Sequence, residues 1–365
     1  MVPDLGIIYK LKDIAKIYDG THQTPNYRSS GIPFVSVENI DNIFEFNKYI
    51  SKEAYELEFN KNHPIKGDIL MTRIGDIGTP ALITTDIDMG YYVSLARISM
   101  NNKVLPEYIY FYIQTPQFQH ELWKKTIHVA FPKKINKEDI GKCKIKIFNT
   151  NKQKEISKIL IAIESRILTQ RKIIEDLNRL KMPINSQTFK QKGIIFKIKD
   201  ICEIGRGRVI SNEEIKKQQN PIYPVFSSQT QNNGIMGYLD SYEFDGEYIT
   251  WTTDGANAGT IFYHNEKFNC TNVCGTLKVN NQNISAKYLS SILPYYVKKY
   301  VSKNLANPKL MNNTMSNIEV NIIPKIEQIK FINVLTSIEE KLNNEKSILE
   351  LYIKQKEYLL NKLFI

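Results

Sequence analysis

The chain has 365 residues, of which 42% are hydrophobic, which is typical of a globular protein with two domains of ordinary size. No apolar stretch reaches the roughly 18 residues of a membrane-spanning helix, and the first residues, Met1 to Gly6, lack the pattern of a secretory signal. We therefore expect a cytoplasmic protein with no membrane partner, and its net charge of +11, from 49 basic and 38 acidic residues, favours a polyanionic partner.

Residues 1–150 are predicted to form a mixed α/β globule. Strand patterns occur at 32–37, 68–73 and 144–148, where β-branched and other apolar residues are bounded by turn residues. Residues 107–125 have a helical pattern that Pro116 interrupts.

Residues 151–190 are predicted to form a long helix. Apolar residues recur at alternating four- and three-residue steps over about four heptads, which is the pattern of a coiled-coil seam. Gln170 and Lys181 are polar residues at two seam positions, and Pro183 leads us to expect the regular helix to end or kink near residue 182. The predicted seam residues are Ile156, Leu160, Ile163, Ile167, Ile174 and Leu177.

Residues 191–324 are predicted to form a second mixed globule. Strand patterns occur at 247–252 and 260–264, and residues 285–302 match the interrupted helix of the first globule, with Pro294 inside. The spacing of Cys270 and Cys274 does not make a zinc signature, so we expect all four cysteines of the chain to be buried or half-buried thiols.

Residues 325–365 repeat the first long helix at an offset of 175 residues, so Gln170 aligns with Glu345 and Lys181 with Lys356. The seam residues here are Phe331, Leu335, Ile338, Leu342, Leu349 and Tyr352. Two matched stripes predict an α+β fold in which two mixed globules are separated by two long helices. We expect the helices to pack as an antiparallel coiled coil with an internal pseudo-twofold repeat. The alternative is that each helix packs on its own globule.

Three segments of each globule carry a family resemblance. In the first they are Asp19 to Pro25 (DGTHQTP), Gly31 to Ile40 (GIPFVSVENI) and Gly67 to Gly75 (GDILMTRIG). In the second they are Gly205 to Ser211 (GRGRVIS), Tyr223 to Thr230 (YPVFSSQT) and Ile249 to Thr260 (ITWTTDGANAGT), of which the last, with its tryptophan, is the most specific. These segments resemble the target-recognition domains of the specificity subunit of type I restriction-modification enzymes, and the long helices resemble that family's spacer helices. The resemblance covers essentially the whole chain.

The resemblance implies a non-catalytic subunit that binds a bipartite double-stranded DNA sequence, one half per recognition domain. Its helices would hold two methylation subunits, and restriction motor-nuclease subunits would complete the enzyme. S-adenosylmethionine, ATP and Mg are then expected on those partners, and no cofactor, metal or catalytic residue on this chain.

DNA contact requires flexible cations for phosphates, and forked donors and acceptors for base edges. Residues 124–134 contain four lysines after a helix, and residues 298–309 are the counterpart in the second globule. Gln229 to Asn233 concentrates amides, and Gly207 between two arginines would let the backbone approach DNA closely. The candidate DNA-binding residues are Thr21, His22, Tyr27, Arg73, Lys124, Lys125, His128, Lys133, Arg206, Arg208, Gln229, Thr230, Gln231, Asn232, Asn233, Asp254, Asn257, Lys303 and Lys309.

Two other functions compete with this interpretation. One is a single-chain DNA adenine methyltransferase or nuclease. Asn220-Pro221-Ile222-Tyr223 is one residue away from a methyltransferase element, but no phosphate loop or glycine-rich cofactor loop accompanies it, and we expect a turn before a strand. The other is a coiled-coil scaffold without DNA affinity, from which binding to DNA at low salt would distinguish a specificity subunit.

Overall fold

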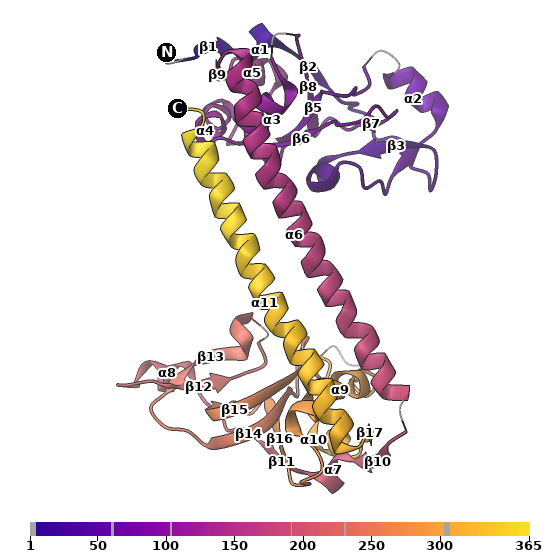
Figure 1. The fold of residues 1–365 in the computed structure, drawn as a ribbon, viewed down its shortest axis with the longest axis vertical. Helices are drawn as coiled ribbons and strands as arrows, with labels where there is room; N and C mark the ends of the chain where they lie inside the picture. The colour runs from indigo at the N-terminus through magenta and orange to yellow at the C-terminus, as the bar shows by residue number, and fades with distance from the viewer. Residues whose placement is uncertain (1–4, 60–61, 103, 191, 230, 303–306) are drawn as a thin grey trace. The chain divides into compact units, whose positions relative to one another are not determined.

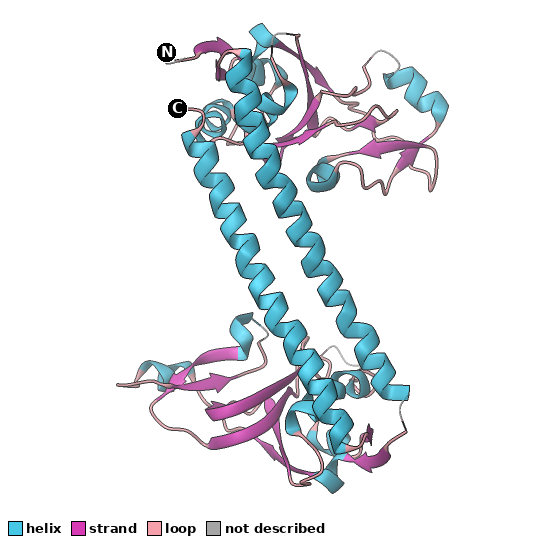
Figure 2. Ribbon diagram, in the orientation of Figure 1, coloured by secondary structure: helices cyan, strands magenta, loops and turns pink. Residues whose placement is uncertain are grey.

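The computed structural model describes residues 5–59, 62–102, 104–190, 192–229, 231–302 and 307–365. The chain divides into two compact units, each of which contains one globular domain and part of each long helix. Unit 1 comprises Met1–Lys172 with Ser347–Ile365, and unit 2 comprises Ile173–Lys346. Helices and strands are mixed in both units (Figure 1) (Figure 2), so the predicted α+β class is confirmed.

The first domain, residues 5–149, carries three small sheets. Its strands are β1 (Ile7–Lys10), β2 (Ala15–Asp19), β3 (Ile32–Val35), β4 (Tyr49–Ile50), β5 (Ile69–Ile74), β6 (Asp76–Leu82), β7 (Gly90–Tyr91), β8 (Leu95–Met100) and β9 (Lys144–Ile147). Its helices are α1 (Leu11–Ile14), η1 (Val37–Asn42), α2 (Lys52–Phe59), α3 (Pro106–Ile113), α4 (Pro116–Lys125) and α5 (Lys137–Gly141). The sheet orders are β2-β8-β5-β6, β4-β3-β7 and β1-β9.

Strand β5 joins two hydrophobic cores of this domain. Successive side chains of a strand point to opposite faces, so Ile69 and Met71 enter a core shared with α3 and α4, while Leu70 enters a second core with Phe34. The predicted break in the helix is also present. The Thr115 hydroxyl accepts the Phe118 N–H at 3.3 Å, which caps α4 at its first turn.

The second domain, residues 192–324, is built on one larger sheet. Its strands are β10 (Ile194–Lys197), β11 (Cys202–Arg206), β12 (Tyr223–Phe226), β13 (Ile235–Leu239), β14 (Phe244–Thr252), β15 (Ile261–Cys270), β16 (Cys274–Val279) and β17 (Glu319–Ile322). Its helices are α7 (Ile198–Ile201), α8 (Asn212–Lys216), η2 (Gln231–Gly234), α9 (Ala286–Val297) and α10 (Asn312–Ser316). The large sheet has the order β11-β16-β14-β15-β12-β13, and β10 pairs with β17.

The tryptophan of the most specific sequence motif is a core residue. Trp251 on β14 is fully buried, and its Nε1–H donates to the Leu310 carbonyl oxygen at 2.8 Å. Gly275 on β16 lies against the indole, and a Cβ at that position would stand only 2.2 Å from the ring. Trp251 therefore stabilises the packing of the sheet and positions the turn that follows β14.

The repeat seen in the sequence is a repeat of structure. The β1–β9 pair has the register Tyr9 with Ile145, and the β10–β17 pair matches it with Phe196 and Val320. Helices α5 and α10 begin at Lys137 and Asn312, and strands β9 and β17 begin at Lys144 and Glu319, so both pairs share the 175-residue offset.

Each long helix is fastened to its own domain by a buried glutamine. The Gln153 side chain accepts the Leu105 N–H at 3.0 Å and donates to the Phe148 carbonyl oxygen at 2.8 Å. Gln328 accepts the Ser285 N–H at 2.9 Å and donates to the Ile323 carbonyl oxygen at 2.8 Å. The two glutamines occupy equivalent positions, so both helices leave their domains from the same local geometry.

The two long helices are α6 (Thr150–Lys190) and α11 (Lys325–Lys362). Helix α6 does not end near residue 182 but continues past Pro183 to Lys190, in agreement with the predicted bounds of 151–190. A proline removes one backbone hydrogen bond, and helix propagation on both sides of it maintains the remainder. The predicted stripes are buried or half-buried along both helices, and Gln170 and Glu345 are buried with them.

The apolar stripes of the two long helices also pack against the globular domains. Ile156, Leu160 and Ile163 belong to the core of the first domain, and Phe331 and Leu335 belong to that of the second. Each helix therefore packs on its own domain over its first turns, as the alternative interpretation held.

Within unit 1 the two helices also pair with each other. Lys356 Nζ lies 2.7 Å from Glu164 Oε1, and the Arg166 guanidinium lies 5.8 Å from the Tyr352 ring centroid. Positions on α11 fall as positions on α6 rise, so the helices are antiparallel there. Leu360 and Phe364 complete that core.

All four cysteines are free and buried, as expected. Burial raises the pKa of Cys143 and of Cys202 to about 12, so both stay protonated thiols at neutral pH. Among the described helices, none is both long enough and apolar enough to cross a membrane.

Candidate nucleic-acid interface

Residues 124–134 are here named the lysine loop and comprise the last two residues of α4 and the segment that follows it. The Ile127 N–H donates to the Lys134 carbonyl oxygen at 2.8 Å, which closes the loop. The Gly75 N–H donates to the Lys133 carbonyl oxygen at 2.8 Å, which joins the loop to the β5–β6 turn. Gly75 has a φ of +81°, a conformation that glycine adopts without strain.

The second domain builds the same base. The Ser302 N–H donates to the Lys309 carbonyl oxygen at 3.0 Å, and the Gly255 N–H donates to the Pro308 carbonyl oxygen at 3.0 Å. Residues 303–306 lie outside the described part of the chain, and the candidate Lys303 is among them.

A third hydrogen bond completes the match between the loops. The Ile135 N–H donates to the Arg73 carbonyl oxygen at 3.0 Å, and the Leu310 N–H donates to the Thr253 carbonyl oxygen at 2.9 Å. The bases of the two loops are thus equivalent in their backbone hydrogen bonds, and each is attached to the turn that follows β5 or β14.

The lysines of the first loop differ in their freedom. Lys124 and Lys125 lie 3.2 and 3.3 Å from the carboxylate of Glu121 on α4. Burial acts to raise the pKa of Glu121, but the Lys144 N–H and these two lysines outweigh it and lower that pKa below its ordinary value. Lys133 is exposed, and the described residues place no carboxylate in ion-pair range of it.

In the second domain the turn residue Asp254 holds the loop. Its carboxylate lies 3.8 Å from Lys309 Nζ and accepts the Asn307 side-chain amide at 2.5 Å. The Asn257 side chain donates to the Ser228 carbonyl oxygen at 3.3 Å. Asp254 is therefore brought together with Lys309, and the side chains of Asp254 and Asn257 both serve the local structure.

The prediction that Arg73 contacts DNA is not supported by its position. Arg73 is buried, ion-paired with Asp19 and hydrogen-bonded from Nε to the Ile135 carbonyl oxygen at 3.1 Å. In the second domain Arg206 stands at the position of Asp19 and reaches across to Thr253, whose Oγ1 it contacts at 3.3 Å. One arginine thus bridges the same two strands in each domain. Arg206 is exposed and remains a candidate for phosphate contact.

The glycine between Arg206 and Arg208 has a structural role that we did not expect. A Cβ on Gly207 would lie 2.1 Å from the Cys270 carbonyl oxygen, and one on Gly20 would lie 2.4 Å from the Tyr91 carbonyl oxygen. Both glycines permit close contact with a neighbouring strand of their own domain, and this packing accounts for them without DNA.

Arg208 is engaged by two acidic residues. Its guanidinium pairs with Glu214 and Glu243, and these contacts, Glu214 first, raise its pKa above the ordinary value. A guanidinium held by two carboxylates is poorly available to a phosphate.

The remaining candidates are turn residues. Gln229 and Asn232 donate their side-chain amides to the Ile235 carbonyl oxygen, the latter at 3.5 Å. Thr230 and the side chains of Gln231 and Asn233 lie outside the described structure.

The first motif of the first domain forms a turn as well. Thr21 is buried and its hydroxyl accepts the Gln23 N–H at 3.2 Å, whereas His22 and Tyr27 are exposed. Lys48 Nζ lies over the ring of Tyr27, 5.4 Å from its centroid. His128, on the lysine loop, is exposed and its Nε2 lies 2.9 Å from the Trp123 carbonyl oxygen.

Lys134 is a further exposed cation of the lysine loop that was not among the predicted DNA-binding residues. Its offset of 175 residues from the candidate Lys309 is the signal in the sequence that identifies it. The methyltransferase-like segment forms a turn that enters β12, as expected, and its Asn220 N–H donates to Asp240 at 2.8 Å.

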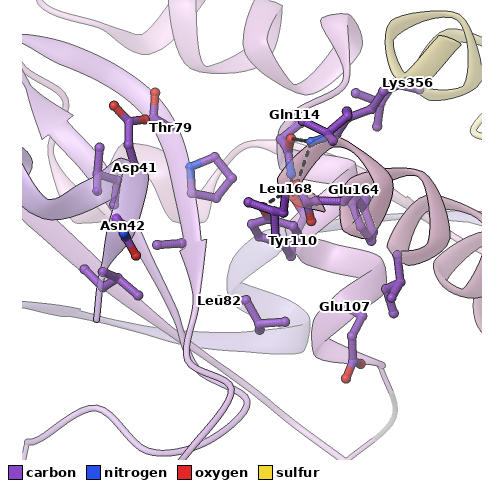
Figure 3. A pocket seen from close by; sticks show the side chains of 18 of the residues that line it. Asp41, Asn42, Thr79, Leu82, Glu107, Tyr110, Gln114, Glu164, Leu168 and Lys356 are labelled. Atoms are coloured by element: carbon purple, nitrogen blue, oxygen red, sulfur yellow. Dashed lines mark hydrogen bonds and ion pairs between the residues drawn. The ribbon is translucent and has the colours of Figure 1, made fainter. Parts of the chain in front are cut away.

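A pocket of about 880 Å³ lies in unit 1 between β6, α3 and the two helices (Figure 3). Lys356 bonds Gln114 at 2.9 Å and Glu164 at 2.7 Å, and the Tyr110 hydroxyl donates to the same Glu164 oxygen at 3.0 Å. Burial and Glu164 raise the pKa of Tyr110. The charged residues of the lining are Asp41, Asp76, Glu107, Glu164, Arg171, Lys356 and Glu357. This acidic excess does not suit a phosphate backbone. The described residues contain no cluster of three or more His, Cys, Asp or Glu placed to hold a metal ion.

The chain is similar to known proteins over both of its domains. The family model of the type I restriction modification DNA specificity domain matches residues 7–179 and again residues 194–351. A predicted type I specificity subunit of Mycoplasma pneumoniae (S.MpnORF289P, N-terminus) is 49% identical over 140 residues, which are 38% of this chain and 74% of that protein. The MpnII specificity subunit of the same organism is 41% identical over 173 residues, 46% of this chain and 52% of that protein.

Solved structures share the fold. The type I restriction-modification S subunit of M. genitalium has a TM-score of 0.68 at 15% identity, with 100% of this chain and 97% of that one covered. A chain from a structure describing assembly of the type I restriction-modification system has a TM-score of 0.60 at 12% identity, with 100% and 98% covered. With two family domains, two lysine-bearing loops on one kind of base and two long helices, the chain belongs to the type I restriction-modification DNA specificity family.

Proposed function

We propose that this chain is the DNA-reading subunit of a type I restriction-modification complex and that each domain binds one half of a bipartite duplex sequence. The observation that carries the proposal is the duplicated base of the lysine-bearing loops. In each domain the same three backbone hydrogen bonds hold such a loop beside the turn that follows β5 or β14. A protein that reads two half-sites needs two such surfaces, and this chain builds one in each unit.

The long helices are the proposed docking elements for two methylation subunits, and motor-nuclease subunits would join the complex. The chain itself would bind no S-adenosylmethionine, ATP or Mg and would perform no catalysis. It would act in the cytoplasm. The relatives support a place in a type I complex, because one is the specificity subunit of a type I restriction enzyme and another comes from a structure describing assembly of such a system. The turn at Asn220 offers no support for a methyltransferase on this chain.

Mapping of methylated adenines in host DNA, with and without this gene, tests the proposal. We expect one split sequence to lose its methylation when the gene is removed. The purified chain alone should not transfer a methyl group from S-adenosylmethionine. Methyl transfer by the isolated chain, or an unchanged methylation map, would refute the proposal.

A further inference from the structure

The tip of the lysine loop exposes two apolar side chains. Val129 has 97% of its surface accessible and Phe131 has 103%. Resting on the DNA-reading function proposed above, we propose that Phe131 is a wedge that inserts between base pairs of the half-site bound by the first domain.

The loop holds this tip in a defined place. Its base is closed by the bond between Ile127 and Lys134, and the next residue, Ile135, is fully buried in the domain core. On the other arm the His128 ring lies 5.0 Å from the ring of Trp123 on α4. The tip is therefore presented by an anchored loop, so less ordering entropy is lost on insertion than for a free chain.

The charges around the tip select duplex DNA as the occupant. Lys124, Lys133 and Lys134 flank the apolar residues along the chain. Lys124 pairs with Glu121, whereas Lys133 and Lys134 are exposed and lie in ion-pair range of no carboxylate in the described structure. An apolar tip flanked by such cations matches a duplex, whose phosphates attract the lysines while a parted base step receives the ring. A protein partner would need an acidic apolar groove instead, and that alternative is one outcome of the test.

The two domains differ in sequence at these two positions. The 175-residue offset places Asn304 and Ala306 at the sequence positions of Val129 and Phe131. Neither position carries a large apolar side chain, although Leu305 stands between them in the sequence. Both half-sites are therefore probed, and the proposal concerns the half-site of the first domain.

The experiment uses the complex of this chain with its methylation subunits and a duplex that carries the mapped target. 2-Aminopurine is placed in turn at each position of both half-sites, and its fluorescence is measured on binding. We expect a rise at one step of the half-site of the first domain. Phe131→Ala should abolish that rise and weaken binding about tenfold, the scale of one missing base stack, whereas Phe131→Trp should retain both.

The matched control is Leu57→Ala, which removes an exposed apolar side chain, 85% accessible, from α2 of the same domain. It should change neither signal nor affinity. The wedge is refuted if the wild-type complex binds its target with no rise in that half-site, or if Phe131→Ala binds as the wild type does. Loss of the methylation subunits in Phe131→Ala would instead assign the tip to a protein contact and equally refute the wedge. Absence of DNA binding by the wild-type complex would be a failure of the proposed function.

Discussion

At the scale of single residues, two buried glutamines determine how the long helices start. Each accepts a backbone N–H and donates to a backbone carbonyl oxygen of the domain from which its helix leaves. Gln153→Ala leaves those groups buried and unpaired, which costs about 1–3 kcal/mol. We expect the free energy of unfolding, measured by urea denaturation, to fall by that amount, and by a similar amount for Gln328→Ala.

The exposed Gln117 on α4 gives the control for this prediction. Gln117→Ala should change the free energy of unfolding by less than about 0.5 kcal/mol. If Gln153→Ala were as stable as Gln117→Ala, the hydrogen bonds of the buried Gln153 side chain would contribute nothing to stability.

A buried histidine in the second domain predicts a dependence of stability on pH. Burial lowers the pKa of His264 from 6.5 to about 4, and its Nε2 lies 2.9 Å from Thr250 Oγ1. Glu266 lies 3.9 Å away and would raise that pKa, but its side chain is half exposed, so we expect burial to dominate. Between pH 6.5 and about 4 the unfolded chain binds a proton that the folded chain does not. Stability should therefore fall by roughly 3 kcal/mol as the pH drops through that window.

Thermal unfolding followed from pH 8 to pH 4 measures this effect. His264→Asn should remove that part of the pH dependence, and the exposed His22→Asn should not. Parallel pH profiles for the wild type and His264→Asn would show that His264 becomes protonated in the folded state.

At the scale of elements, the lysine loop predicts a change in the salt dependence of DNA binding. Each neutralised phosphate contributes a slope of about −0.9 to the logarithm of affinity against the logarithm of salt concentration. Replacing Lys124, Lys125 and Lys133 with alanine should weaken binding to all sequences alike and reduce the slope by about one for each phosphate that is no longer neutralised.

A control of equal charge change is available elsewhere in the domains. Lys12, Lys52 and Lys199 are exposed and lie outside both loops and both long helices. Their triple alanine variant should keep the wild-type slope, and equal slopes for the two triple variants would exclude the loop as a phosphate-binding element.

Elements also show how far sequence reasoning reached. The heptad steps and the constant offset predicted both helices, because side-chain burial along a helix follows local periodicity. They could not predict that Arg73 pairs with Asp19, because that contact joins residues on separate strands and depends on their register. Nor could they tell the exposed Phe131 from a core phenylalanine, since both have the same chemistry and differ only in their surroundings.

At the scale of the whole molecule, the duplication assigns recognition of each DNA half-site to a separate domain. The domains match in framework and differ in the lengths and side chains of their loops, which is where specificity is expected. Replacing residues 1–150 with those of a relative that has a different target should change one half of the methylated sequence and leave the other intact. Sequencing of modified adenines measures the outcome, and a change in both halves would contradict independent reading.

The constant 175-residue offset begins at the lysine loops and continues through α5 and α10, β9 and β17, and the clamping glutamines. Upstream of the loops the spacing between equivalent strands varies, as β2 and β11 differ from β9 and β17 in offset. One inserted residue at the start of a long helix would turn every later side chain by about 100° about the helix axis. Length changes upstream leave that phase untouched. A change of loop length upstream of the lysine loops therefore leaves unchanged which side chains of each long helix face its partners.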